Sequence, residues 1–275
     1  MIARHHELID CHIRLQHAAY EGQREGVLER AWRAGVAACV CSSQYERDWH
    51  FLLEQAATDV RFIPCFGIDP VGLAERPKDW YHKLQLCLNT GPAAVGMVGL
   101  DRSVRTVSLK DQEEALQMQL LLAGRMQCPV LLRCGGEWQR LVTLLEMLDE
   151  APSGYLLSGY HGPVRLVERF VRTGAYFCFN GDTLVHKFSR AARLLKAVPL
   201  DRLLFATDSP AAIPPDPFAP YQLLDADRHP INEPANLPHL VEGVAPVLDL
   251  EPDELARMLQ HNALCLFGTL MPAEA

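Results

Sequence analysis

Residues 8–14 of the 275-residue chain read Leu-Ile-Asp-Cys-His-Ile-Arg, a short apolar run that passes directly into polar side chains. Runs of this length, when helical patterns follow them, are typical of buried strands in a parallel sheet. The turn at 10–14 contains no glycine, so its backbone cannot cradle a pyrophosphate as a dinucleotide-binding loop does. The stretch therefore favours a parallel α/β fold and argues against an open nucleotide-binding sheet.

Seven further strand-like runs follow the first. The eight runs cover residues 8–11, 37–41, 61–66, 95–100, 130–132, 155–157, 176–179 and 203–206. Stretches with apolar residues at three- and four-residue spacing separate them, at 26–34, 49–57, 113–126, 138–148, 164–171 and 184–197. Eight strands alternating with helices over this length predict a (β/α)8 TIM-type barrel, with residues 1–275 forming a single domain.

The segment that follows the last predicted strand has a different composition. Residues 210–230 are rich in Pro and Asp, and we expect a long loop beside the barrel mouth, where barrel enzymes place their chemistry. Helical patterns at 237–248 and 252–267 complete the chain.

Composition narrows the classes of function. The chain has 26 Lys and Arg against 34 Asp and Glu, a net charge of −8, which argues against a broad basic surface for nucleic acid. No apolar run reaches the length of a membrane span and the N-terminus lacks a signal core, so we expect a cytoplasmic protein without membrane contact. The nine cysteines lie mostly in apolar runs, which predicts buried free thiols rather than a zinc ribbon.

Short motifs at the predicted strand ends occur in a fixed order along nearly the whole chain. They are Ile9-Asp10-Cys11-His12, Gly67-Ile68-Asp69-Pro70, Gly96-Met97-Val98-Gly99-Leu100-Asp101, Thr207-Asp208-Ser209-Pro210, Asn232-Glu233-Pro234 and the closing Asn262 to Phe267-Gly268. In this order they resemble the TatD-like deoxyribonucleases, a family of amidohydrolase-type barrels. The resemblance implies a barrel that uses divalent metal to hydrolyse phosphodiesters, notably in DNA.

The resemblance also implies a ligand set that this chain does not keep. The family's ligands are two His of the first strand, a Glu of the fourth, a His of the fifth, a His of the sixth and an Asp of the eighth. The matching positions here hold His12, Arg14, Met97, Arg133, Ser158 and Asp208. The site is thus expected to be degenerate, with no cofactor, or at most one zinc, manganese or magnesium ion held weakly by His12 and Asp208.

Two interpretations of the arginines remain open. Arginine has no lone pair to give a metal and stays charged at physiological pH. In the first interpretation Arg14 or Arg133 forms a guanidinium–carboxylate pair with Asp208 and takes the place of the metals. In the second, His12, Arg14, Arg133, Ser158 and Asp208 form a pocket that binds a phosphate or carboxylate ligand without cleaving it.

Other polar residues near the predicted strand ends receive simpler interpretations. We expect His161 on a surface loop, and Cys134 not to act as a nucleophile. Asp10 is expected to orient His12 or Arg14. For Asp101 two roles stay open, a carboxylate that orients neighbouring loops and a catalytic carboxylate. Asn232 and Glu233 are expected to close the Pro-rich loop against the mouth.

Three functional hypotheses follow. The first is a hydrolase homologue that has lost metal catalysis and serves as a scaffold or an anion-binding protein. The second is a residual metal-dependent hydrolase or deoxyribonuclease, in which Asp208 is the catalytic residue. The third is a subunit of a complex whose protein partner supplies the chemistry. Nucleic acid or a small phosphate or carboxylate would be the ligand.

Overall fold

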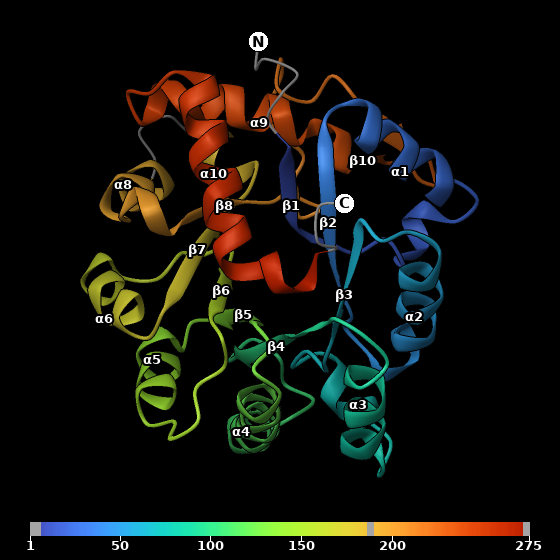
Figure 1. Cartoon of the computed structure of the whole chain (residues 1–275), viewed down its shortest axis with the longest axis vertical. Helices are drawn as coiled ribbons and strands as arrows, with labels where there is room; N and C mark the ends of the chain where they lie inside the picture. The colour runs from blue at the N-terminus through green and yellow to red at the C-terminus, as the bar shows by residue number, and fades with distance from the viewer. Residues whose placement is uncertain (1–6, 186–189, 272–275) are drawn as a thin grey trace. The chain divides into compact units, whose positions relative to one another are not determined.

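The computed structural model describes residues 7–185 and 190–271 (Figure 1). Eight strands form one sheet in the order β1 to β8. They are β1 (Leu8–Ile13), β2 (Val36–Ser42), β3 (Phe62–Phe66), β4 (Ala94–Asp101), β5 (Val130–Gly135), β6 (Tyr155–Ser158), β7 (Ala175–Phe179) and β8 (Leu203–Phe205). The strands are parallel and alternate with helices, so the predicted (β/α)8 TIM-type fold is confirmed.

Helices lie at each of the predicted stretches, and one further helix covers Trp80–Leu88, where none was predicted. They are α1 (Arg24–Arg33), α2 (Trp49–Thr58), α3 (Trp80–Leu88), α4 (Leu109–Met126), α5 (Trp138–Glu146), α6 (Val167–Arg172), α7 (Asp182–Val185), α8 (Arg190–Ala197), α9 (Leu237–Val244) and α10 (Pro252–Phe267). The helix predicted over 184–197 is described as two pieces, α7 and α8, and residues 186–189 between them lie outside the described residues.

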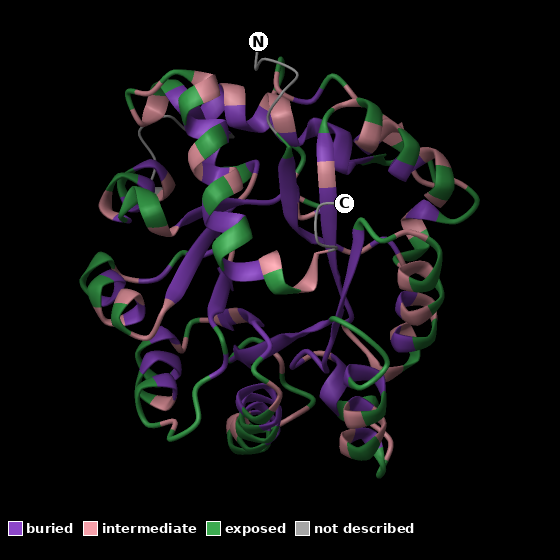
Figure 2. Ribbon diagram, viewed as in Figure 1, coloured by how far each residue is buried: buried purple, intermediate pink, exposed green. Residues whose placement is uncertain are grey.

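The strands carry the hydrophobic core. All six residues of β1 and all eight of β4 are buried, as Figure 2 shows by the purple colour of the strands. Strands of a parallel sheet are covered on both faces, so they read as continuous apolar runs rather than as alternating patterns. Eight of the nine cysteines are buried and all nine are free, as predicted; Cys265 is the exception because it is exposed. No helix within the described ranges is long and apolar enough to cross a membrane.

Contacts group the chain into two compact units, and the first consists of residues 1–41 and 178–265. In this unit β1 pairs with β2, with Asp10 opposite Cys39. Arg30 of α1 donates to both carboxylate oxygens of Glu233 at 2.6–3.0 Å, and the Tyr20 hydroxyl donates to the carbonyl of Asn232. These contacts anchor the end of the Pro-rich segment. Most of 210–230 is irregular, as predicted, with a short hairpin of β9 (Leu223–Leu224) and β10 (Pro230–Ile231).

The second unit consists of residues 42–177 and 266–275. Its strands β4 and β5 pair so that Gly99 lies opposite Arg133 and Asp101 opposite Gly135. Gly99 has a φ of +150°, and a Cβ there would lie 1.9 Å from the carbonyl oxygen of Arg133. The glycine therefore lets the two strands approach each other at Arg133.

Candidate functional site

The first cluster of site residues lies in the first unit, where β1 ends beside residues 207–209. The backbone N–H of Asp208 donates to the carbonyl of His12, and that of Arg14 donates to the carbonyl of Ser209. These bonds fix the side chains of His12 and Asp208 next to each other. The His12 Nδ1 lies 3.1 Å from Asp208 Oδ1, and Asn180 donates to the other carboxylate oxygen at 3.3 Å.

The charge of Asp208 is stabilised by its neighbours. Burial acts to raise the pKa of this carboxyl, but the hydrogen bond from His12 and the charges of His12 and Arg14 outweigh it, so the pKa falls below its ordinary value. Asp208 is therefore ionised at neutral pH, and it pairs with a histidine. The predicted arginine–carboxylate pair at Asp208 is wrong, because Arg14 influences this carboxylate only through its charge.

One atom of the Arg14 side chain, Nε, has no hydrogen-bond acceptor within residues 7–185 and 190–271. This atom is buried. A buried donor without an acceptor costs about 1–3 kcal/mol. Arg14 Nε is thus a donor that can still form a hydrogen bond to an oxygen acceptor.

Asp10 supports this cluster from below. It is fully buried and accepts hydrogen bonds from the Thr207 N–H at 3.0 Å and the Thr207 hydroxyl at 2.5 Å. Burial raises its pKa to about 7, although the bonds from Thr207 oppose the shift. Asp10 therefore fixes the segment that carries Asp208. Of the two residues that it was expected to orient, it contacts His12, whose backbone N–H donates to Asp10 Oδ1 at 3.4 Å.

The second cluster lies in the second unit and centres on Arg133. Its guanidinium donates to Asp69 Oδ2 at 3.1 Å and to Asp101 Oδ2 at 3.0 Å. The two carboxylates are nearly buried, with exposed side-chain fractions of 3% and 6%. A Cβ at Gly135 would lie 2.1 Å from Asp101 Oδ1, so the glycine makes room for this carboxylate. Arg133 therefore pairs with Asp69 and Asp101 rather than with the expected Asp208.

The structure places the other expected residues as follows. Met97 is buried in β4, and Ser158 ends β6 and is half-buried. His161 is exposed, as predicted, and packs edge-on against Trp138 with 5.3 Å between ring centroids. Cys134 is buried, and desolvation raises the pKa of its thiol to about 12, which makes it a poor nucleophile.

Three participants were not recognised from the sequence as partners of the site. Asn180 binds Asp208, Asp69 binds Arg133, and Arg30 binds Glu233. The signal for Asp69 was present in the sequence, since an acid stands where the family has a histidine while Arg133 replaces another histidine. Those two changes are complementary in charge.

The donor set tests whether the two clusters fit a pair of divalent ions. Of the six positions that the family pattern assigns to ligands, only His12 and Asp208 hold a metal-binding side chain of the usual kind. These two bond to each other, and an arginine charge acts on Asp208. A separate triad of Asp225, Asp227 and His229 has ligand atoms within 4.8 Å of one another, but it is largely exposed.

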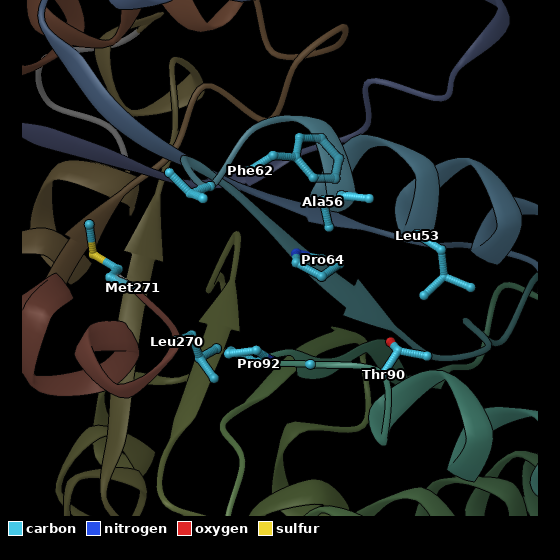
Figure 3. A pocket seen from close by; sticks show the side chains of 11 residues that line it. Leu53, Ala56, Phe62, Pro64, Thr90, Pro92, Leu270 and Met271 are labelled. Carbon is cyan, nitrogen blue, oxygen red and sulfur yellow. The ribbon is translucent and has the colours of Figure 1, made fainter. Parts of the chain in front are cut away.

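A cavity in the second unit is unrelated to these clusters. It measures about 390 Å³ and is lined by apolar side chains such as Leu53, Phe62 and Leu270 (Figure 3). Phe62 is the first residue of β3, so the cavity lies at the amino end of that strand. Arg133 and Asp101 lie towards the carboxyl ends of their strands, where barrel enzymes place their sites.

Comparison with known proteins identifies the lineage. The profile of the TatD related DNase family matches residues 9–268. The chain is 28% identical to the 3'-5' ssDNA/RNA exonuclease TatD of Salmonella typhimurium, covering 94% of this chain and 98% of that protein. It is 27% identical to the deoxyribonuclease TATDN3 of Homo sapiens, covering 96% and 95%.

Solved structures agree. The TatD homologue YJJV of Escherichia coli superposes with a TM-score of 0.84 at 25% identity, covering 98% of this chain and 99% of that one. A TatD family hydrolase of Entamoeba histolytica shares the fold at 18% identity, with a TM-score of 0.82 and coverage of 97% and 99%. The chain therefore belongs to the TatD-related DNase family, a family of metal-dependent hydrolases.

Proposed function

We propose that this protein is a TatD-family homologue that binds phosphate-bearing ligands, nucleic acid among them, without the metal pair that cleaves them. The observation that carries the proposal is Arg14, whose buried Nε has no acceptor in the described residues although it lies in the cluster of His12 and Asp208. A phosphate oxygen is a good acceptor for a guanidinium, because Arg and phosphate match in charge and in fork geometry.

Metal binding is disfavoured at the same place by charge as well as by ligand count. A guanidinium near a divalent ion repels it, by about 4 kcal/mol per unit-charge pair at ~4 Å with an effective dielectric constant of ~20. Asp208 already has a hydrogen-bonding partner in His12 and a second in Asn180. A metal would have to displace these contacts and tolerate Arg14.

Nucleic acid is proposed as a ligand because of the relatives. The Salmonella protein is named for single-stranded DNA and RNA, and it is similar along almost its whole length. The Arg133 cluster plays a different part in our proposal, because Asp69 and Asp101 outnumber the single guanidinium. Arg133 acts as an internal clamp, and Arg14 contacts the anion.

A second candidate function is residual hydrolysis. It is favoured by the retained His12–Asp208 pair, which supplies one imidazole and one carboxylate for a single ion. In that case Asp208→Asn would abolish turnover of a single-stranded DNA substrate with magnesium, manganese or zinc present. Under our proposal the protein has no Asp208-dependent turnover to abolish.

The test combines metal analysis with ligand binding. We expect the purified protein to contain much less than one equivalent of tightly held metal, and to bind a fluorescein-labelled oligothymidylate equally well with and without a chelator. Arg14→Met, which keeps the apolar stem and removes the charge, should weaken this binding at least threefold. Two metal equivalents together with Asp208-dependent turnover would overturn the proposal.

A further inference from the structure

The loop between β4 and α4 forms a second cationic feature at the carboxyl end of β4. The loop, residues 102–108, contains Arg102 and Arg105 and no acidic residue, in a chain whose net charge is −8. Arg102 and Arg105 line a cavity of about 500 Å³ together with Val104, Val107, Ser108 and Leu109. None of these residues belongs to either cluster described above.

Hydrogen bonds from Gln112 and Asp101 brace the loop. The Gln112 side chain accepts from the Asp101 N–H at 2.8 Å and donates to the carbonyls of Asp101 at 3.1 Å and Val107 at 3.3 Å, so it braces both ends of the loop. The Asp101 carboxylate also accepts from the N–H and hydroxyl of Ser103, at 2.8 and 2.6 Å. A ligand that binds here does not have to order the backbone first, which lowers the cost of binding.

The two arginines differ in what they already contact. Arg102 forms an ion pair with Glu137, at the start of α5. Arg105 is exposed, and no hydrogen bond or ion pair of its side chain occurs among residues 7–185 and 190–271. The cavity therefore carries one uncompensated positive charge next to one that is compensated by a carboxylate.

The loop also adjoins the Arg133 cluster. The Arg102 N–H donates to the carbonyl of Gly135 at 3.0 Å, and Asp101 contacts both Ser103 and Arg133. The cavity is thus built on the same carboxylate that receives Arg133. A ligand at the carboxyl ends of β4 and β5 would reach the loop as a neighbouring position.

We infer that the Arg102–Arg105 cavity is a subsite for an oxyanion, namely a phosphate group of a single-stranded nucleic acid. The inference rests on the proposed function, because it takes a phosphate-bearing ligand as given and assigns it a further contact. Arg105 provides the charge. Arg102 adds a second donor when the phosphate competes with Glu137 for it.

The experiment measures how oligonucleotide binding depends on salt. Each phosphate contact with a single strand contributes about 0.7 to the slope of log affinity against log salt concentration. We expect Arg105→Ala to reduce that slope by about 0.7 for an oligothymidylate of about 12 nucleotides. We also expect it to weaken binding about twofold to fivefold near 0.1 M salt, the range for one exposed ion pair.

Matched variants separate a local contact from a general loss of charge. Arg125 is an exposed arginine at the other end of α4, so Arg125→Ala makes the same change in net charge away from the cavity and should leave the slope unchanged. Glu137→Gln frees Arg102 and should tighten binding about twofold to fivefold. A structural role of the ion pair alone would not produce tighter binding.

The outcomes are distinct. Equal slopes for Arg105→Ala and Arg125→Ala would overturn the inference, and the proposed function would survive if Arg14→Met still weakened binding. Loss of binding on Arg105→Ala with none on Arg14→Met would support the subsite and overturn the role of Arg14. If inorganic phosphate, followed by thermal shift, binds through Arg105 but the oligonucleotide does not, the ligand is free phosphate and the nucleic-acid assignment is wrong. If neither probe binds the wild-type protein, both proposals fail.

Discussion

Replacing Arg133 by methionine removes a cation that forms ion pairs with two nearly buried carboxylates, Asp69 and Asp101. Loss of one partner from a fully buried ion pair costs about 3–5 kcal/mol, because the remaining charge stays in a region of low dielectric constant. The Arg133 side chain is 38% exposed, so water screens part of the interaction. We therefore expect the free energy of unfolding to fall by about 2–3 kcal/mol.

This loss can be measured directly. Domains of this size change their melting temperature by about 2–4 °C per kcal/mol, so the variant should melt roughly 5–10 °C below the wild type. Urea unfolding should show a midpoint lower by about 1 M with an unchanged slope. Restoring charge balance in the triple variant Arg133→Met, Asp69→Asn, Asp101→Asn should recover most of the loss, since uncharged amides are cheaper to bury than unpaired carboxylates.

The control is Arg125→Met, because Arg125 is exposed on the same unit and should change stability by no more than about 0.5 kcal/mol. Equal stability of the Arg133 and Arg125 variants would refute the reasoning. It would mean that Asp69 and Asp101 are solvated or have other counter-charges. Destabilisation without recovery in the triple variant would show instead that packing of the arginine stem, and not its charge, sustains the cluster.

Two further predictions follow from buried ionisable groups. Because the pKa of Asp10 is raised to about 7, the native state holds a proton that the unfolded chain releases near pH 4. The free energy of unfolding should therefore decline by up to about 4 kcal/mol as pH rises from about 4 to 7. Asp10→Asn should flatten this decline in unfolding experiments at pH 5 and pH 8. An unchanged pH dependence in the variant would exclude Asp10 as its source. Among the nine thiols, Cys265 alone is exposed. Brief treatment of the native protein with iodoacetamide should therefore modify one cysteine per chain, as measured by mass spectrometry. Early labelling of Cys134 would contradict its burial.

The sequence predicts the fold well, because each buried strand is visible in the sequence as a short run of apolar residues. The run at 95–100 becomes β4 with one further residue at each end, and 155–157 becomes β6 with one further residue. Side-chain partners are harder to predict, because they depend on register between strands. Arg133 lies opposite Gly99, and Asp101 is two residues further along β4, so its side chain projects from the same face of the sheet. No pattern within β4 or β5 alone indicates how the residues of the two strands align.

The register explains why Arg14 and Arg133 have different environments. Arg133 stands next to a strand that ends in Asp101, and Asp69 is also within hydrogen-bonding distance, so its guanidinium is satisfied on two sides. Arg14 follows β1, and His12 of that strand already contacts one carboxylate oxygen of Asp208. Asn180 donates a hydrogen bond to the other oxygen of that carboxylate. An arginine thus forms an internal ion-pair clamp in one place, while in the other its Nε has no acceptor among the described residues. Only the second has a reason to bind an anion from outside, which is why the proposal places the ligand at Arg14.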